Sequence, residues 1–283
     1  MIKRILVPLD RSESCRTATR VAAALAAAAD ATLDGVAVFD LHAIEDSTAS
    51  MGIGSSPFAR SAREDMVEDE RDEVLTGLRH FEEECRAAGV RSSGAVRAGD
   101  TTARLVEEIH GHDLTVMGGR TLPGEGFEHS EELIRHLLVH AARPMLVAGR
   151  APATPLGPAL LGWDGSLAAA QALQSFALLF PPALVGRVTV ATLHGKAAAE
   201  GAVLAARNQA EIAVGYLRAH GFEAELRVEA GEARDRLPAL ARSLGVRLVI
   251  LGAYSHTRLQ ELVFGSVTRR LVDDGEFHLF LDR

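Results

Sequence analysis

The sequence predicts an α/β protein built from two tandem, doubly wound domains, each with a five-stranded parallel sheet. Three observations support this prediction: the chain of 283 residues is longer than one compact domain needs, its pattern repeats, and apolar strand segments alternate with helix segments. The strand segments are almost continuously apolar, which is typical of parallel strands buried on both faces. Strands that alternate with helices indicate parallel sheets with right-handed crossovers.

Both copies of the repeat begin with the same succession of elements. Residues 2–10 (IKRILVPLD) and 157–164 (GPALLGWD) are apolar strands that end in Asp, and each is followed by an Ala-rich helix. The pairing continues with a second strand, at residues 32–40 in the first copy and 186–195 in the second. Similarity that extends through a whole copy in the same order indicates duplication of one domain.

The predicted domains cover residues 1–150 and 157–283, each with the order β-α-β-α-β-α-β-α-β. The junction at residues 149–158 (GRAPATPLGP) is rich in Pro, Gly and Ala, a composition typical of a linker. Residues 42–61 form an insertion in the first copy that is rich in Ser, Gly and Ala and lacks periodicity. A surface loop is the simpler hypothesis for this insertion, and a lid over a site is the alternative.

Composition and charge limit the classes of function. The formal net charge is −8 and no long cluster of Lys and Arg occurs, which indicates that nucleic acid is not the main partner. Cys15 and Cys85 belong to no CxxC or Cys/His cluster, so we expect neither a disulfide framework nor a metal site. Residues 1–10 have no long apolar core followed by a cleavage site, so we expect no signal peptide there, and the Ala-rich run 21–29 is too short to span a bilayer. We therefore expect a cytoplasmic protein that does not bind membranes.

The segment 248–272 (LVILGAYSHTRLQELVFGSVTRRLV) has the spacing of a phosphate-binding loop. Gly252 is expected at a strand end, where a residue without Cβ lets the backbone pass close to a phosphate. Gly265 is expected at a helix start, which offers unpaired N–H groups and a partial positive charge. Together these features predict an anion site that needs no basic cluster. The candidate phosphate-binding residues are Gly252, Ser255, Gly265, Ser266, Val267 and Thr268.

Asp164 ends the first strand of the same copy and is expected across the strand-order switch from Gly252. A carboxylate at this place can accept a hydrogen bond from a ribose hydroxyl or help to hold Mg²⁺. Either glycine alone is more often simple turn punctuation, so the prediction depends on the combination. The copy contains no GxxxxGK[ST] and no GxGxxG motif, so the sequence does not support those nucleotide-binding folds.

The pattern Gly252-x2-Ser255-x9-Gly265-Ser266 resembles the universal stress protein family, whose nucleotide-binding members carry Gly-x2-Gly-x9-Gly-Ser/Thr after the fourth strand. The resemblance extends over nearly the whole chain and implies a Rossmann-like fold of the adenine nucleotide alpha hydrolase type. It implies that ATP, or else ADP or AMP, binds here with or without Mg²⁺. By the same resemblance, Asp164 contacts the ribose and the backbone near Gly195 contacts the base.

Two residues of the second copy depart from the family pattern. Ser255 stands at the second glycine, where a positive φ would cost Ser roughly 1 kcal/mol or more. Gly162 stands where nucleotide-binding relatives often have the Pro that the first copy keeps as Pro8.

The first copy departs further from the pattern. It keeps Gly118 but has Thr121 at the second glycine, and Glu131 and Glu132 replace Gly-Ser at a helix start that Ser130 is expected to cap. A triphosphate near these glutamates would meet repulsion on the order of 1 kcal/mol or more from each. We therefore predict one nucleotide site per chain, in the second copy.

The last strands, residues 143–150 and 276–283, are expected at sheet edges, and an exposed apolar edge favours pairing. In the family such strands pair between domains, so the two copies can pair within one chain as a pseudo-dimer, and a homodimer of chains is also open.

The leading hypothesis for function is a stress-response sensor or regulator that binds an adenine nucleotide and contacts unknown protein partners. The alternatives are a nucleotide-free scaffold and a nucleotide-hydrolysing or adenylyl-transferring enzyme. No catalytic residue set is recognisable, so slow ATP hydrolysis is the most that we expect.

Overall fold

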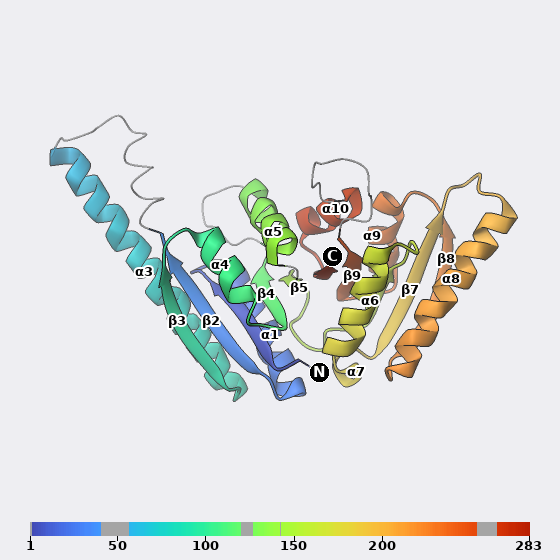
Figure 1. Ribbon diagram of the computed structural model, residues 1–283, viewed down its shortest axis with the longest axis horizontal. Coiled ribbons are helices and arrows are strands. Elements are labelled where there is room, and N and C mark those ends of the chain that lie inside the picture. The colour runs from blue at the N-terminus through green and yellow to red at the C-terminus, as the bar shows by residue number, and fades with distance from the viewer. Residues whose placement is uncertain (1, 41–56, 120–126, 142, 254–264) are drawn as a thin grey trace.

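The fold is one continuous ten-stranded sheet with helices on both faces (Figure 1). The computed structural model describes residues 2–40, 57–119, 127–141, 143–253 and 265–283. The strands of the N-terminal half are β1 (Arg4–Leu9), β2 (Thr32–Phe39), β3 (Ser92–Ala98), β4 (Leu114–Gly118) and β5 (Met145–Ala148). Those of the C-terminal half are β6 (Ala159–Gly162), β7 (Arg187–His194), β8 (Glu223–Ala230), β9 (Leu248–Gly252) and β10 (His278–Asp282).

The strand order across the sheet is β3-β2-β1-β4-β5-β10-β9-β6-β7-β8. All strands within a half are parallel, and the two halves have the same doubly wound order, which confirms the predicted fold class. The two sheets are not separate, because β10 pairs with β5 in antiparallel orientation, with Phe280 opposite Leu146. The pairing within one chain that the apolar last strands favoured is therefore present.

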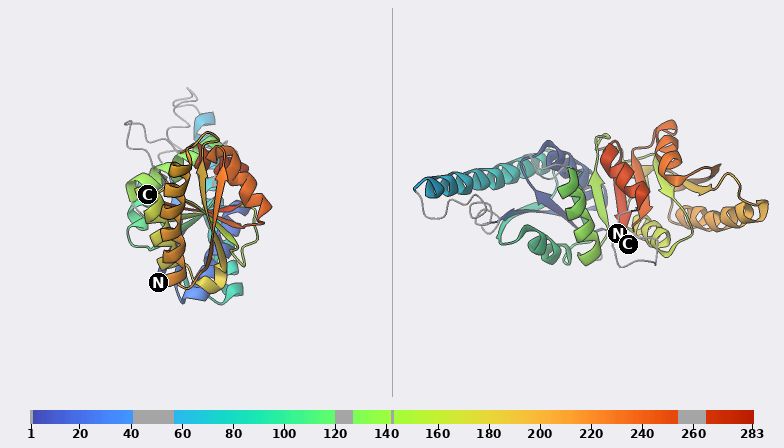
Figure 2. Two further views of the ribbon diagram at one scale, coloured as in Figure 1. Left: turned by 90° about the vertical axis from the view of Figure 1, so that its right-hand side faces the viewer. Right: turned by 90° about the horizontal axis from the view of Figure 1, so that it is seen from above.

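Helices cover the two faces of the sheet as two layers. One layer contains α1 (Glu13–Ala29), α3 (Pro57–Ala88), α6 (Leu167–Leu179) and α8 (Glu200–Ala219), and its buried side chains form one apolar cluster across both halves. The other contains α4 (Thr101–Ile109), α5 (Phe127–Ala141), α9 (Ala233–Ser243) and α10 (Ser266–Asp274), with a second continuous cluster. Viewed from above, α3 reaches out at one end of the molecule and α8 at the other (Figure 2). A short helix, α7 (Pro182–Val185), precedes β7.

The insertion predicted at residues 42–61 lies mostly outside the described residues. Its last part, from Pro57 on, is not the loop that we predicted but the beginning of α3. Proline suits the first turn of a helix, because its fixed φ is already helical and its missing N–H has no intrahelical partner there.

Among the described helices, none has both the length and the apolar composition needed to cross a membrane.

His278 connects the linker to the centre of the sheet. Its Nδ1 accepts a hydrogen bond from the Gly149 N–H at 3.1 Å, and its Nε2 donates to the Pro152 carbonyl oxygen at 3.0 Å. Burial lowers the pKa of His278, as does the nearby Arg247 cation, although the contact with Pro152 opposes this shift. The neutral imidazole can make both hydrogen bonds at once, so it holds the linker against the first residue of β10.

Candidate functional site

Asp164 lies in an exposed turn between the end of β6 and the start of α6. The backbone N–H of Ser166 donates to Asp164 Oδ1 at 2.9 Å, and Ser166 Oγ accepts from the Ala169 N–H at 3.2 Å as the cap of α6. Gly165 has a φ of 74°, a conformation that glycine adopts without strain. One carboxylate oxygen of Asp164 is thus fixed by the turn, and the side chain faces solvent at the carboxyl edge of the sheet.

Gly252 ends β9 beside this turn. We predicted a glycine here because the backbone would pass close to a phosphate, but the structure shows that packing against α6 requires it. A Cβ atom on Gly252 would lie 2.3 Å from the carbonyl carbon of Ala168 and 2.5 Å from the Ala169 nitrogen, in the first turn of α6. Gly118, the equivalent residue at the end of β4, would place a Cβ 2.7 Å from Ser14 in the first turn of α1. Both glycines are therefore required for close helix–strand packing, whether or not a phosphate lies nearby.

Gly265 has no comparable packing reason. Its φ is −54°, which any residue can adopt, and no atom of the described residues lies within 4 Å of the position that a Cβ would occupy. It is the N-cap residue of α10, and no side chain caps this helix in the described part of the chain. The first intrahelical hydrogen bond runs from the Arg269 N–H to the Gly265 oxygen, so the N–H groups of Ser266, Val267 and Thr268 precede it.

The three residues after Gly265 face different ways. Ser266 is exposed beside Gly265, whereas Val267 packs against the apolar cluster under α10 and Thr268 is buried, with 4% of its surface exposed. Val267 and Thr268 thus offer their backbone N–H groups to the helix end rather than their side chains. Ser266 is the member of this group whose hydroxyl is at the surface.

The described candidate residues come together at the carboxyl edge of three neighbouring strands. β6 lies between β9 and β7, so Asp164 after β6, Gly252 at the end of β9 and Gly195 after β7 share this edge. Gly195 is exposed, and its carbonyl oxygen lies 3.0 Å from His194 Nδ1. The chain order reverses between β6 and β9, which is where ligands bind in open α/β sheets. Ser255 falls outside the described residues, as does Thr121 of the first copy.

The corresponding edge of the N-terminal half is covered. Asp10, the equivalent of Asp164, also accepts the N–H two residues on, from Ser12 at 2.7 Å, but only 8% of its surface is exposed. Gly77 of α3 packs directly on it, because a Cβ at Gly77 would lie 2.9 Å from the Asp10 carbonyl oxygen. Glu73 lies on the same helix and forms an ion pair with Arg11 at 3.5 Å.

The helix after β4 also differs from its counterpart. We expected α5 to begin near Glu131 with Ser130 as its cap, but it begins at Phe127. Because Glu131 corresponds to Gly265, α5 extends about one turn further than α10, through the place where the candidate site has a helix end. Glu132 is exposed within this helix and lies 3.6 Å from Arg135. The predicted glutamates therefore lie inside α5 and do not cap it.

Comparison with known proteins identifies the family. The model of the universal stress protein family matches residues 1–149 and again residues 156–276. The chain belongs to the universal stress protein family. No curated protein matches the chain.

Solved structures of universal stress proteins share this fold over the full chain. A universal stress protein from Archaeoglobus fulgidus DSM 4304 is 15% identical, with a TM-score of 0.70 over 99% of this chain and 96% of that one. A putative universal stress protein from Pseudomonas aeruginosa UCBPP-PA14 is also 15% identical, with a TM-score of 0.59 over 99% of this chain and 92% of that one. Identities this low support the arrangement of the elements and nothing more specific.

In this universal stress protein, the sequence did not predict that the polar side chain of Gln209 lies beside the turn that holds Asp164. A Cβ on Gly165 would lie 2.6 Å from Oε1 of Gln209 on α8, so the amide of Gln209 lies over the turn that holds Asp164. No local pattern indicates this contact, because α6, β7 and part of α8 separate the two residues in the sequence. The packing of α8 beside α6 brings them together.

Replacing Asp10 with Asn should stabilise the protein most at alkaline pH. Burial raises the pKa of Asp10 to about 6; the hydrogen bonds from Ser12 oppose this and the Glu73 carboxylate adds to it. The folded state then binds more protons than the unfolded state between about pH 4 and 6, so stability falls as the pH rises through this range. Asn keeps an acceptor for Ser12 and has no charge to bury. At pH 8 we expect Asp10→Asn to raise the free energy of unfolding by about 1–3 kcal/mol.

Urea denaturation at pH 4.5 and pH 8 measures this effect. Asp164→Asn is the matched control, since it makes the same change in the same turn at an exposed position, and it should alter stability little at either pH. An equal effect of Asp10→Asn at both pH values would contradict the raised pKa of the buried Asp10 carboxyl group.

Proposed function

We propose that the chain binds one adenine nucleotide, with ATP as the first candidate, at the carboxyl edge of the C-terminal half. The nucleotide changes how the protein contacts its partners, which makes the chain a regulator in a stress response. Membership of the universal stress protein family supports the adenine nucleotide as the ligand class. The residues at this edge support the place at which the nucleotide binds.

The start of α10 is the observation on which the proposal mainly rests. Three backbone N–H groups precede the first intrahelical hydrogen bond, and Gly265 contributes no side chain to cap them. The described residues leave the space beside the Gly265 Cα open, so a phosphate can approach these donors and the positive end of the helix dipole. A glycine at this position is explained by an approaching ligand, since neither its φ nor its packing requires one.

Asp164 supplies the second part of the proposed site. Its carboxylate is held in place by the Ser166 N–H and is exposed beside the open edge, so it can accept a ribose hydroxyl or help to hold Mg²⁺. The backbone at Gly195 is exposed on the far side of β6 from β9, which suits the base. The N-terminal half lacks this opening, because α3 covers Asp10 and α5 extends through the equivalent of Gly265.

Isothermal titration calorimetry with ATP and Mg²⁺ should give one site per chain. The expected stoichiometry follows from the covered edge of the N-terminal half. Asp164→Ala should weaken binding by about tenfold or more, because the fixed acceptor is lost. Asp10→Ala is the matched control and should leave the ATP affinity unchanged. Two equivalent sites per chain would contradict the asymmetry between the halves.

A nucleotide-free scaffold is the rival function, and copurification separates it from the proposal. Acid extraction of the purified protein should release material with the absorbance and mass of an adenine nucleotide. A protein that releases none and shows no heat of binding with ATP, ADP or AMP would be a scaffold.

A further inference from the structure

A cavity of about 400 Å³ lies at the amino edge of the C-terminal half, at the opposite end of the strands from Asp164. Its walls are the residues before β6, α7, the first residues of β7 and β8, and the segment after α9. Its volume is within the range of small-molecule sites, about 300–1,000 Å³. Four of its lining residues are Pro158, Thr189, Glu225 and Val246.

The duplicated fold shows which residues of the N-terminal half occupy these positions. Leu6 and Leu160 are equivalent, because each lies four residues before the Asp that follows the first strand of its half. Leu6 pairs with Asp34 and Leu160 pairs with Thr189, so Asp34 and Thr189 are equivalent. The next strand then places Ser93 opposite Asp34 and Glu225 opposite Thr189.

The other two equivalences follow from backbone hydrogen bonds. The Asp113 N–H donates to the Arg4 oxygen, and the Arg247 N–H donates to the Pro158 oxygen, both at 2.9 Å. Arg4 therefore corresponds to Pro158, and the residue before Asp113 corresponds to the residue before Arg247. The four equivalent pairs are Arg4 and Pro158, Asp34 and Thr189, Ser93 and Glu225, and His112 and Val246.

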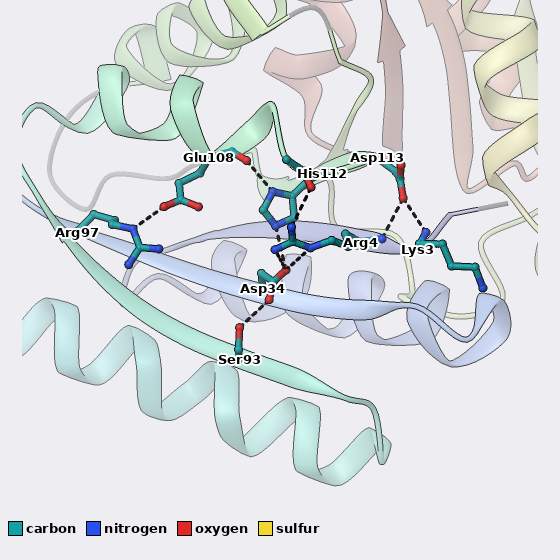
Figure 3. Close-up of polar contacts among 9 residues, drawn as sticks. Lys3, Arg4, Asp34, Ser93, Arg97, Glu108, His112 and Asp113 are labelled. Atoms are coloured by element: carbon teal, nitrogen blue, oxygen red, sulfur yellow. Dashed lines mark hydrogen bonds and ion pairs between the residues drawn. The ribbon is translucent and has the colours of Figure 1, made fainter.

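In the N-terminal half this place is filled by a polar cluster centred on a carboxylate (Figure 3). Arg4 donates to Asp34 Oδ2 from Nη2 at 2.8 Å and from Nε at 3.1 Å, and His112 Nε2 lies 3.0 Å from the same oxygen. Ser93 Oγ donates to Oδ1 at 2.6 Å. Burial raises the pKa of Asp34, but the hydrogen bonds from Ser93, Arg4 and His112 outweigh it and hold the pKa below its usual value.

The C-terminal half also has a carboxylate here, on Glu225 at the position of Ser93, but it has neither the arginine nor the histidine that contacts Asp34. The cavity is also lined by Arg187, which lies 4.0 Å from Glu223. Thr189 Oγ1 donates to Glu225 Oε1 at 3.3 Å, and Arg227 Nε lies 3.8 Å from the same oxygen. Both distances are long for contacts to a carboxylate, and both contacts use one of its two oxygens. The residues that correspond to Arg4 and His112 are Pro158 and Val246, and both of these line the cavity.

We propose that this cavity binds a free, metabolite-sized organic cation with a guanidinium or primary ammonium group on a short alkyl chain. The cationic group occupies the place that the Arg4 guanidinium has in the N-terminal half and donates to the Glu225 carboxylate. The alkyl chain lies against Val185, Leu244 and Val246, which line the apolar part of the cavity. This site is separate from the nucleotide site, since the two lie at opposite edges of the sheet.

Titration of the ¹⁵N-labelled full chain with n-butylguanidinium tests the proposal. The backbone amide signals of Thr189, Glu225 and Val246 should shift and saturate, while those of Asp164 and Gly195 stay unchanged. n-Butylurea has the same shape without the charge, and it should bind at least about tenfold more weakly. Equal binding of the two compounds, or no saturable shift at about 10 mM n-butylguanidinium, would overturn the proposal.

Two variants on one strand give a matched comparison. Glu225→Gln keeps the shape of the side chain and removes its charge, so affinity should fall about tenfold or more. Glu229→Gln makes the same change further along β8, at a residue outside the cavity lining that is paired with Arg236, and affinity should stay within about twofold. Val246→Phe enlarges a lining side chain and leaves residue 225 unchanged, and it should abolish binding. Unchanged affinity in Glu225→Gln or Val246→Phe would refute the site.

A capped Ala-Arg-Ala peptide separates a free cation from an arginine side chain of another protein. Weaker binding of the peptide than of n-butylguanidinium supports a free small molecule. Tighter binding of the peptide would overturn that part of the proposal.

Discussion

Replacing Gly252 with Ala is expected to lower the free energy of unfolding by about 2–4 kcal/mol. The added Cβ would lie 2.3 Å from the Ala168 carbonyl carbon and 2.6 Å from its oxygen, and these backbone atoms belong to the first turn of α6. Neither β9 nor α6 can yield easily, since both are packed in the centre of the C-terminal half. Urea denaturation monitored by circular dichroism measures the loss.

Two glycine controls show whether the loss comes from steric contact. Gly118→Ala at the end of β4 should destabilise in the same direction, because its Cβ would lie 2.7 Å from the Ser14 backbone. Gly215→Ala on α8 meets no atom within 4 Å and should be neutral or slightly stabilising, as alanine favours helix. If Gly252→Ala were as stable as the wild type, a phosphate-binding role would again be the best explanation for this glycine.

Replacing Gly265 with Glu is expected to weaken ATP binding by about 100-fold or more while the fold stays intact. The new carboxylate would stand beside the three N–H groups that precede the first intrahelical hydrogen bond of α10, where it can cap them and repel a phosphate. The open space at Gly265 accommodates the side chain without a clash, so stability should not fall. Calorimetry with ATP measures the affinity, and urea denaturation checks the fold.

The matched control for this variant is Gly215→Glu. It adds the same charge at another exposed glycine with no atom within 4 Å of its Cβ position, away from the start of α10. ATP affinity should be unchanged there, apart from a small effect of net charge. Wild-type affinity in Gly265→Glu would falsify the placement of the phosphates at α10. The two motif glycines thus have opposite expected phenotypes, loss of stability at Gly252 and loss of ligand at Gly265.

The parts of the candidate site that were predictable depend on local sequence. The turn at Asp164 after β6 and the helix start at Gly265 follow from apolar runs that stop at small or polar residues. Once the strand order is known, the doubly wound topology brings Gly195, Gly252 and Asp164 to one edge. The sequence did not predict that Gly252 and Gly265 are needed for different reasons. α6 fills the space beside the Gly252 Cα, whereas the described residues leave the space beside the Gly265 Cα open.

The amino-acid sequence by itself determined the duplication, the alternation of strands and helices, and the apolar last strands that join the halves through β5 and β10. Hydrophobic patterning and turn chemistry act over a few residues, so they can be recognised without knowing the contacts. Only the tertiary structure decided that Gly77 of α3 covers Asp10, that α5 extends past the equivalent of Gly265, and that Pro158 and Val246 leave a cavity where Arg4 and His112 fill the other half. These differences arise where segments far apart in the chain come within contact distance, because burial and charge pairing depend on that packing rather than on any local pattern.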